Sequence, residues 1–253
     1  MSIDKLIERD RYDQRAKLLN GIKFEDGINS SGVDYVHPLY KEPYIQYENM
    51  LTTNISCSST VIELGAGTGA FTRSLLNCAG KVFAIDISSH SLNILNKRHH
   101  QFHNLETLVA DMESLPFLDN SVDVIVSSGS LSYGDNFIVM SEIYRVLKKG
   151  GKFICVDSLH HNPVYIINRI YNYLCGNRTL STLLRMPTIS MLESYRLKFG
   201  KQELNFYGSI SWAIPLLSKI IGVDKASELS KKIDITIGVK KSAFKFTMLV
   251  EKI

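Results

Sequence analysis

The sequence predicts an α/β fold, with a mostly parallel β-sheet that helices cover on both faces. Three observations favour this class. Between Thr60 and Val156, short runs rich in Val, Ile and Leu alternate with segments of helical periodicity, which is typical of parallel strands joined by crossover helices. The run Val122–Ser127 is almost continuously apolar, as in a central parallel strand. A glycine-rich turn from Gly65 to Gly69 follows the first run directly.

The composition fits a globular protein with a sizeable core. Of the 253 residues, 45% are apolar and 21% are charged. A net charge of +4 suits an anionic small substrate but is too weak to indicate nucleic acid. The four cysteines are widely spaced, so we expect no metal site. The N-terminus has no apolar signal region, and no apolar run approaches the roughly 20 residues of a membrane span. We therefore expect a cytoplasmic protein without membrane insertion.

The first 52 residues are expected to be mainly helical. Residues 3–20 carry apolar positions at helical spacing, and residues 21–32, rich in Gly, Asn and Ser, predict a loop. A second helix is expected from Pro43, a residue suited to a first helical turn, to about Leu51. The tyrosines around it fit packing of a lid helix, although they could also line an aromatic pocket.

The central part predicts five strands with helices between them. The strands are expected at 60–64, 81–86, 105–110, 122–127 and 152–156, and the helices at 69–77, 89–100 and 136–148. After Asp157, residues 160–201 predict further helices. A strand is expected near 204 and an edge strand over 243–251. The apolar stretch Trp212–Ile221 fits core packing or, alternatively, an interfacial contact.

Polar residues follow several strands at their carboxyl ends, where open α/β sheets bind ligands. The first is the turn Gly65–Gly69, whose glycines let backbone N–H groups approach a ligand. By glycine spacing alone this turn also fits a nicotinamide dinucleotide. Asp86 ends the second strand and can accept hydrogen bonds from a ribose diol. Asp111 ends the third strand, where an acid can accept an adenine amino group, and the small-residue turn Ser127–Ser130 follows the fourth.

Three stretches resemble the class I S-adenosylmethionine (SAM) methyltransferases. They are Glu63–Gly69, Ala110–Ile125 and Ile143–Ile154, and the resemblance covers roughly residues 58–157. It implies a Rossmann-like sheet of seven strands, SAM as the cofactor and S-adenosylhomocysteine (SAH) as its product. A dinucleotide enzyme would leave Asp111 unexplained, so the acid favours SAM.

This resemblance implies one domain over residues 1–253 with four parts. These are an N-terminal helical lid (1–52), a SAM-binding core (58–157), a helical substrate cap inserted after the fifth strand (158–202) and the C-terminal strands of the sheet (203–253).

The resemblance also assigns cofactor contacts residue by residue. The amino acid half of SAM is assigned to Glu63, Gly65, Ala66, Gly67 and Gly69, with Glu63 ordering the turn rather than touching the ligand. The ribose and adenine are assigned to Asp86, Ile87, Asp111 and Met112, and the region of the sulfonium to Ser128 or Gly129. The segment around Tyr12 resembles the lid that folds over the cofactor in many small-molecule methyltransferases; an ordinary surface helix is the alternative.

Candidate acceptor residues follow the fifth strand. His160, His161 and Asp157 are candidate general bases, because methyl transfer to a hydroxyl requires loss of its proton. For histidines at a strand–helix junction, capping or solvation is the alternative. An anionic acceptor could be bound by a set of cationic and aromatic residues: Tyr133, Tyr165, Arg169, Arg178 and Arg185.

The acceptor class is less strongly indicated than the cofactor. The turn after the fourth strand lacks the Asn/Asp-Pro-Pro-Tyr/Phe signature of nucleobase or glutamine N-methylation, and no nucleic-acid module is evident. Residues Asp157–Tyr165 and the downstream arginines resemble bacterial methyltransferases of surface-polysaccharide biosynthesis, which implies O-methylation of a sugar hydroxyl. The alternatives are C- or N-methylation of a quinone-like metabolite and a non-catalytic SAM-binding module. The sequence predicts no oligomeric state.

Overall fold

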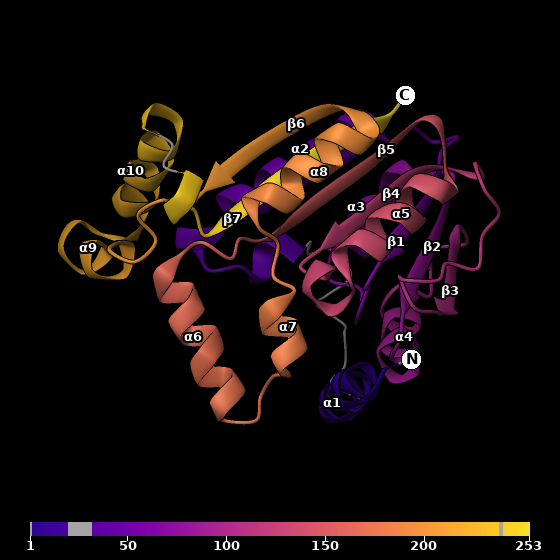
Figure 1. Ribbon diagram of the computed structural model, residues 1–253, viewed down its shortest axis with the longest axis horizontal. Helices are drawn as coiled ribbons and strands as arrows, with labels where there is room; N and C mark the ends of the chain where they lie inside the picture. Colours follow the sequence, from indigo (N-terminus) through magenta and orange to yellow (C-terminus); the bar gives the residue numbers. More distant parts are fainter. Residues whose placement is uncertain (1, 20–31, 238–239) are drawn as a thin grey trace.

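The computed structural model describes residues 2–19, 32–237 and 240–253. The loop expected over 21–32 lies outside these residues except for Gly32. Figure 1 shows one twisted sheet with helices on both sides and a group of helices that stands away from it. The expected α/β class is confirmed.

The sheet has seven strands in the order β3-β2-β1-β4-β5-β7-β6. Adjacent strands from β3 to β5 are parallel, and β7 is antiparallel to both β5 and β6. Their bounds are β1 Thr60–Leu64, β2 Lys81–Asp86, β3 Leu105–Val109, β4 Val122–Ser128, β5 Leu147–Ser158, β6 Gly200–Tyr207 and β7 Lys245–Lys252. Strands β1 to β4 and β7 begin and end within two residues of the predicted bounds. The helix predicted to reach residue 148 ends at Val146 instead, and β5 begins at Leu147, five residues earlier than predicted.

The edge position expected for residues 243–251 is wrong. β7 lies between β5 and β6, and seven of its eight residues are buried. A strand with a neighbour on each side has both of its rows of backbone polar groups paired, and here helices also cover both of its faces. The edges of the sheet are β3 and β6.

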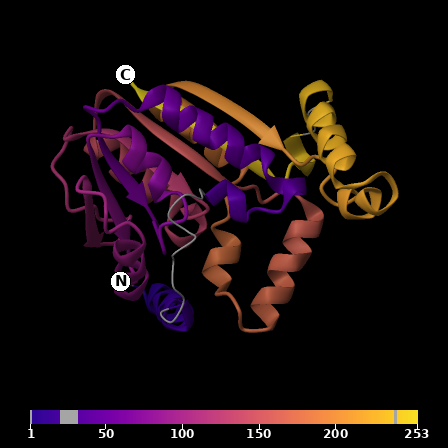
Figure 2. The same ribbon diagram turned by 180° about the vertical axis from the view of Figure 1, so that it is seen from behind.

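Two layers of helices bury the sheet. One face packs on α5 (Asn136–Val146) and α8 (Ile189–Phe199), where Phe153 stacks on Tyr195. The other face packs on α2 (Glu42–Asn54) and α3 (Thr72–Cys78) through Tyr47 and Leu51. Figures 1 and 2 show these two pairs on opposite sides of the sheet. Helix α4 (Ser89–Arg98) packs beside β2 and β3.

The remaining helices surround one end of the sheet. Helix α1 (Ile3–Leu19) packs on α4, whereas α6 (Pro163–Leu174) and α7 (Leu180–Leu184) project away from the sheet (Figure 1). Between β6 and β7 lie α9 (Ile214–Ile221) and α10 (Val223–Thr236). Short 3₁₀ helices complete the chain: η1 Gly32–Tyr35, η2 Pro38–Tyr40, η3 Leu131–Tyr133 and η4 Lys240–Ser242. None of the described helices is both long and apolar enough to cross a membrane.

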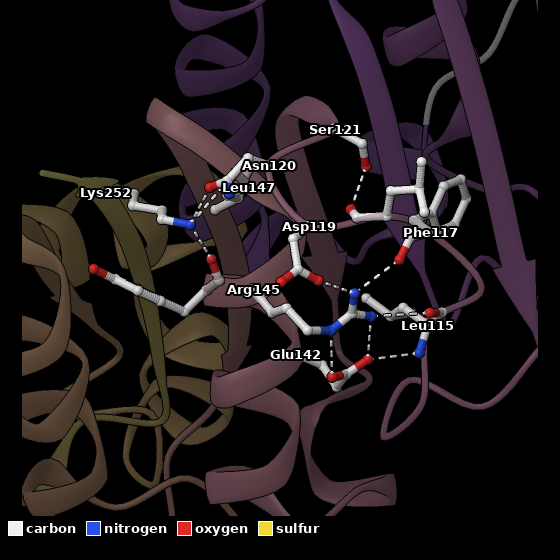
Figure 3. Close-up of polar contacts among 11 residues, drawn as sticks. Leu115, Phe117, Asp119, Asn120, Ser121, Glu142, Arg145, Leu147 and Lys252 are labelled. Carbon is white, nitrogen blue, oxygen red and sulfur yellow. Dashed lines mark hydrogen bonds and ion pairs between the residues drawn. The ribbon is translucent and has the colours of Figure 1, made fainter.

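Arg145 of α5 fastens the loop that connects β3 to β4 (Figure 3). Its guanidinium donates to the carbonyl oxygens of Phe117 (2.8 Å) and Leu115 (3.0 Å) and pairs with the carboxylate of Asp119 at 2.8 Å. It also donates to Glu142, and these hydrogen bonds hold the pKa of Glu142 below its usual value. The loop begins at Asp111, so this network fixes the chain that leaves the cofactor side of the sheet.

Lys252 of β7 binds the end of the same loop, on the other side from Arg145 (Figure 3). Its ammonium donates to the side chain of Asn120 at 2.8 Å and to the carbonyl oxygens of Tyr144 and Leu147 at 2.6 and 2.8 Å. Asn120 adopts a positive φ of 53°, which asparagine tolerates in turns. The last strand is thereby tied to the turn that begins β4.

We predict that Phe246→Ala destabilises the protein by about 3–5 kcal/mol, because Phe246 is fully buried in central β7 and its loss leaves a cavity. Urea unfolding followed by circular dichroism measures the change. The matched control is Leu118→Ala, which is 81% exposed and should change stability by no more than about 0.5 kcal/mol. Equal effects of the two substitutions would contradict the central position of β7.

Candidate active site

A cleft opens at the carboxyl ends of β1, β2, β3 and β4. It is lined by Lys5, Tyr12, Gly65, Gly67, Ile85, Asp86, Ile87, Ala110, Asp111, Met112, Ser128, Gly129, Ser130 and Tyr133. A second hollow shares Tyr12, Gly65, Gly67 and Ser128 with it and extends over Glu63, Ala66 and Phe71. The structure thus brings the cofactor residues predicted from the sequence to one place, with the exception of Gly69.

The turn after β1 depends on two glycines. Gly65 has φ +63°, and a Cβ there would lie 2.4 Å from the Cβ of Ser130, so this position needs glycine for space as well as for conformation. Gly67 has φ +55°, but a Cβ there would meet no atom within 4 Å. That open space faces the cleft, which leaves the backbone of Gly67 accessible to a ligand. Gly69 packs instead against Leu95 and His99 of the α4 region.

Asp86 joins the glycine turn to the end of β2. Its carboxylate accepts the N–H of Gly67 at 2.9 Å and the N–H of Ser88 at 2.8 Å. Burial raises the pKa of Asp86, and these two N–H donors oppose that rise. Each carboxylate oxygen keeps a lone pair beyond these bonds, so the side chain can still accept hydroxyl donors in the cleft.

Glu63 lies beneath the same turn. It is buried in β1 and accepts the hydroxyl of Thr72, at the start of α3, at 2.6 Å. Burial raises its pKa to about 7, and the nearby charge of Asp86 adds to the rise. The contact links the strand before the turn to the helix after it, which fits the ordering role expected from the sequence.

Lys5 of α1 is a cleft residue that sequence reasoning missed. It is buried, and its ammonium pairs with Asp111 at 2.6 Å and with Glu113 at 2.7 Å. Both oxygens of Asp111, the expected adenine acceptor, therefore receive a lysine hydrogen bond. Lys5, Glu8 and Tyr12 recur at the spacing of one helix face, and this periodicity was the available signal.

Tyr12, Tyr133 and Arg178 meet at the rim of the cleft. The hydroxyl groups of Tyr12 and Tyr133 are 2.6 Å apart, with the rings edge to face, and Arg178 donates to the Tyr133 hydroxyl at 2.8 Å. Burial raises the pKa of Tyr12, and Tyr133 adds to the effect. Among the described residues, no carboxylate forms an ion pair with Arg178. Tyr12 and Tyr133 line the cleft, whereas Arg178 is not among its lining residues and contacts it through the Tyr133 hydroxyl.

Helix α1 bridges the cofactor side and the cap. On one side Asp13 accepts the Ser88 hydroxyl, next to Asp86. On the other, Glu8 accepts the N–H and hydroxyl of Thr179 at 3.1 and 3.0 Å. Helix α1 therefore contacts both the residue after Asp86 and the start of α7, and the lid role of the Tyr12 segment stays a prediction.

The three candidate bases lie outside the cleft. Asp157 is buried, and its carboxylate accepts the N–H groups of Leu131 and Ser158 at 2.9 and 2.6 Å. His161 accepts the N–H of Ile189 at 3.2 Å, and burial followed by the charge of His160 lowers its pKa. Within the described part of the chain, none of the three lines either hollow described above.

The other expected acceptor residues are divided between two places. Arg169 is buried and donates to the hydroxyl of Tyr165, whose ring packs edge to face on Phe244. Arg185 ends α7, and its carbonyl oxygen accepts from Asn136 at 2.7 Å. Neither Arg169 nor Arg185 lines the cleft. Arg178 does not line it either, but it donates a hydrogen bond to Tyr133, which does. In the described chain, no group of three or more His, Cys, Asp or Glu side chains is placed to hold a metal ion.

Comparisons with known proteins agree with this geometry. Residues 62–155 match the family model described as "Methyltransferase domain". The chain is 28% identical to a demethylmenaquinone methyltransferase of Oceanobacillus iheyensis over 52% of its own length and 65% of that relative. It is 33% identical to the demethylmenaquinone methyltransferase of Lactococcus lactis over 61% of its length and 66% of the relative. The chain thus spans less than two thirds of these curated relatives.

The fold also has close structural neighbours. One is geranyl diphosphate C-methyltransferase of Streptomyces coelicolor A3(2), solved with Mg²⁺, geranyl diphosphate and SAH. It matches with a TM-score of 0.59 and 17% identity over 83% of this chain and 79% of the neighbour. Residues 62–155 thus match a methyltransferase domain, and solved methyltransferases that share this fold were determined with SAH or SAM.

We predict that the buried carboxyl of Glu63 makes stability fall as pH rises. Its pKa is about 7 in the folded chain against 4.5 when solvated, so between these values the folded state binds the extra proton. That contribution is complete below pH 4.5 and is lost as pH passes 7, a change of about 3 kcal/mol. Glu63→Gln should remove it.

Unfolding free energies of wild type and Glu63→Gln, measured across this pH range, provide the test. The Gln variant should gain relative to wild type as pH rises, whereas Glu203→Gln, exposed on β6, should run parallel to wild type. A constant difference between Glu63→Gln and wild type at all pH values would contradict the assignment.

Proposed function

We propose that the protein transfers the methyl group of SAM to a carbon of a small hydroxylated aromatic acceptor of the quinol type. The observation that carries the proposal is the contact between Tyr12 and Tyr133, which both line the cleft, and the hydrogen bond that Arg178 donates to Tyr133 from behind. The names of the relatives, demethylmenaquinone methyltransferases, support a quinone-like acceptor.

The residues of the chain fit SAM on two grounds. Gly67 offers an uncovered backbone at the cleft, and Asp86 presents a carboxylate there. We propose that the glycine turn holds the amino acid half, Asp86 and Ile87 the ribose, and Asp111 and Met112 the adenine. When bound, SAM supplies an activated methyl group on a sulfonium whose departure needs no further activation.

The acceptor side is then a matter of alignment and charge. Arg178 and Tyr133 can hydrogen-bond an acceptor oxygen, and a guanidinium favours the ionised form of that oxygen. Ionisation raises electron density on the adjacent ring carbon, which attacks the methyl group in line as the methyl–sulfur bond breaks and SAH leaves. The same ring carbon then gives up its proton to solvent, which restores the aromatic ring. Tyr12 and Met112 line the cleft and exclude water from this step. The proposal uses none of His160, His161 or Asp157 as a base, because all three lie outside the cleft.

O-methylation of a sugar hydroxyl is the second candidate. It is favoured by the absence of Asp and Glu between Asp157 and Glu193, a stretch that carries Arg169, Arg178 and Arg185. Such a cationic cap suits the diphosphate of a nucleotide sugar or a glycan precursor. Its weakness is that, in the part of the chain that the structure describes, none of the three candidate bases Asp157, His160 and His161 lines the cleft.

We predict that Asp86→Ala weakens SAH binding by at least about tenfold, because the variant loses a charged acceptor and releases the N–H of Gly67. Isothermal titration calorimetry with SAH measures it. The matched control is Asp224→Asn, an exposed acid at the start of α10, which should bind like wild type. Equal affinities for Asp86→Ala and wild type, or no binding by wild type, would disprove the cofactor assignment.

We predict that Arg178→Met raises the acceptor KM or lowers kcat by about 10- to 100-fold, since one charge-assisted hydrogen bond is lost. SAH affinity should stay unchanged. Mass spectrometry of a panel containing demethylated quinols, nucleotide sugars and glycan precursors identifies the product that gains CH₂.

Arg196→Met, an exposed arginine paired with Glu193 on α8, is the control and should keep full activity. A methylated sugar with an unchanged quinol would replace the first candidate by the second. SAH binding without turnover on any acceptor would indicate a non-catalytic module.

A further inference from the structure

Helix α6 presents an uncharged apolar surface to solvent. Its one charged residue, Arg169, is buried against the body of the protein. The outward positions are instead apolar and exposed, with Ile167 at 66% and Leu174 at 75%. They are Val164, Ile167, Ile170, Tyr171 and Leu174. A solvent-facing helix side without charge is unusual for a protein surface and indicates a binding face.

Helix α9 extends this surface. Ile214 anchors the helix in the protein, whereas Trp212, Leu216 and Ile220 are 60–74% exposed. The two helices are neighbours: Asn162, which caps α6, donates to the hydroxyl of Ser211 at 3.0 Å, and Val164 and Trp212 line one hollow. Both views show α9 near the start of α6, with the rest of α6 pointing away from the sheet (Figures 1 and 2). We call these outward residues of α6 and α9 the apolar face.

Exposed lysines flank the apolar face, and one of them, Lys240, has its ammonium 5.7 Å from the ring centroid of Phe206. Lys219 lies in α9 and Lys225 in α10, and Lys240 and Lys241 form η4, whose Ser242 carbonyl accepts from Asn162 at 2.7 Å. All four are exposed, and within the described ranges none is paired with a carboxylate, unlike Lys231 and Lys232. The whole stretch from Ser158 to Leu192 also lacks an acidic residue. The face is therefore apolar at its centre and cationic at its margin.

We propose that the apolar face docks the protein onto an anionic lipid bilayer. Apolar side chains with a tryptophan and a tyrosine suit the boundary between headgroups and acyl chains, and marginal lysines suit anionic headgroups. A second copy of the chain fits less well, because the four exposed lysines at the margin of one face would lie against the four of the other, with Asp224 beside Lys225 as an exposed acid at this margin. The contact is peripheral, with α6 and α9 lying at the surface, and it is independent of which acceptor is methylated.

The single tryptophan of the chain, Trp212, reports on this contact directly. Wild-type protein is mixed at low ionic strength with vesicles of phosphatidylcholine alone or with an equal part of phosphatidylglycerol. With phosphatidylglycerol we expect the emission of Trp212 to shift to the blue and to be quenched by brominated lipid. Salt should reverse the binding, because headgroup attraction is screened.

Two double variants test the two components while keeping Trp212. Lys240→Gln with Lys241→Gln should weaken binding to the anionic vesicles about 25-fold, roughly fivefold for each lysine. Ile167→Gln with Leu174→Gln should weaken it at least about tenfold by removing buried apolar area. The matched controls are Lys149→Gln, exposed at the start of β5, and Leu118→Gln, exposed in the loop before β4; both should bind like wild type.

Three outcomes would overturn the proposal. One is a Trp212 emission that anionic vesicles leave unchanged. Another is equal vesicle binding by the face variants and the controls. The third is a blue shift that rises with protein concentration without lipid, accompanied by a dimer on size-exclusion chromatography that Ile167→Gln with Leu174→Gln dissociates; the face would then join two copies of the chain. Because no turnover is measured, failure here leaves the proposed methyl transfer untouched.

Discussion

The structure depends on the hydrogen bond between the Asp86 carboxylate and the N–H of Gly67. It joins the end of β2 to the turn after β1, which can pass close to Ser130 only because position 65 lacks a side chain. Glu63 secures the same turn from below through Thr72. Two carboxylates, Glu63 buried and Asp86 partly exposed at the cleft, thus hold one loop, and desolvation raises the pKa of each. The energetic cost of burying this charge is offset by a fixed conformation of the turn that borders the cleft.

The parallel core was predictable because its signals are local. Strands β1 and β2 begin and end where the apolar runs do, and the acids follow at their carboxyl ends. The C-terminal region was less predictable. Helix α10 buries only Ala226 and Ser230, so it lacks an apolar stripe that periodicity could detect. The central place of β7 depends on pairing with β6, a strand about 40 residues earlier in the chain.

The cofactor half of the site could be inferred from strand ends, but the acceptor half could not. Topology alone determines that Asp86 and Asp111 meet at one edge of the sheet. The contact of Arg178 with Tyr133 joins a cap loop to the turn after β4, and that of Lys5 with Asp111 joins α1 to the end of β3. Such contacts follow from how helices dock on the sheet, for which the sequence offers no local signal. Asp157 illustrates the converse: it follows β5 as expected, yet it binds backbone N–H groups rather than facing the cleft.

The distribution of charge over Ser158–Leu192 connects the proposed methyl transfer with the proposed membrane contact. Within Ser158–Leu192, the stretch without acidic residues, Arg169 is buried and Arg178 contacts Tyr133. The apolar side chains of α6 in the same stretch are exposed. Cations on the inside match a polar or ionised acceptor group, and an apolar exterior with lysines at its margin matches a lipid surface. An acceptor with a polar ring and an apolar tail would satisfy both at once, because its tail could remain in the bilayer while its ring reached Tyr133. The inward arginines and the outward apolar residues of this segment therefore favour the same class of acceptor, one with a polar ring and an apolar tail.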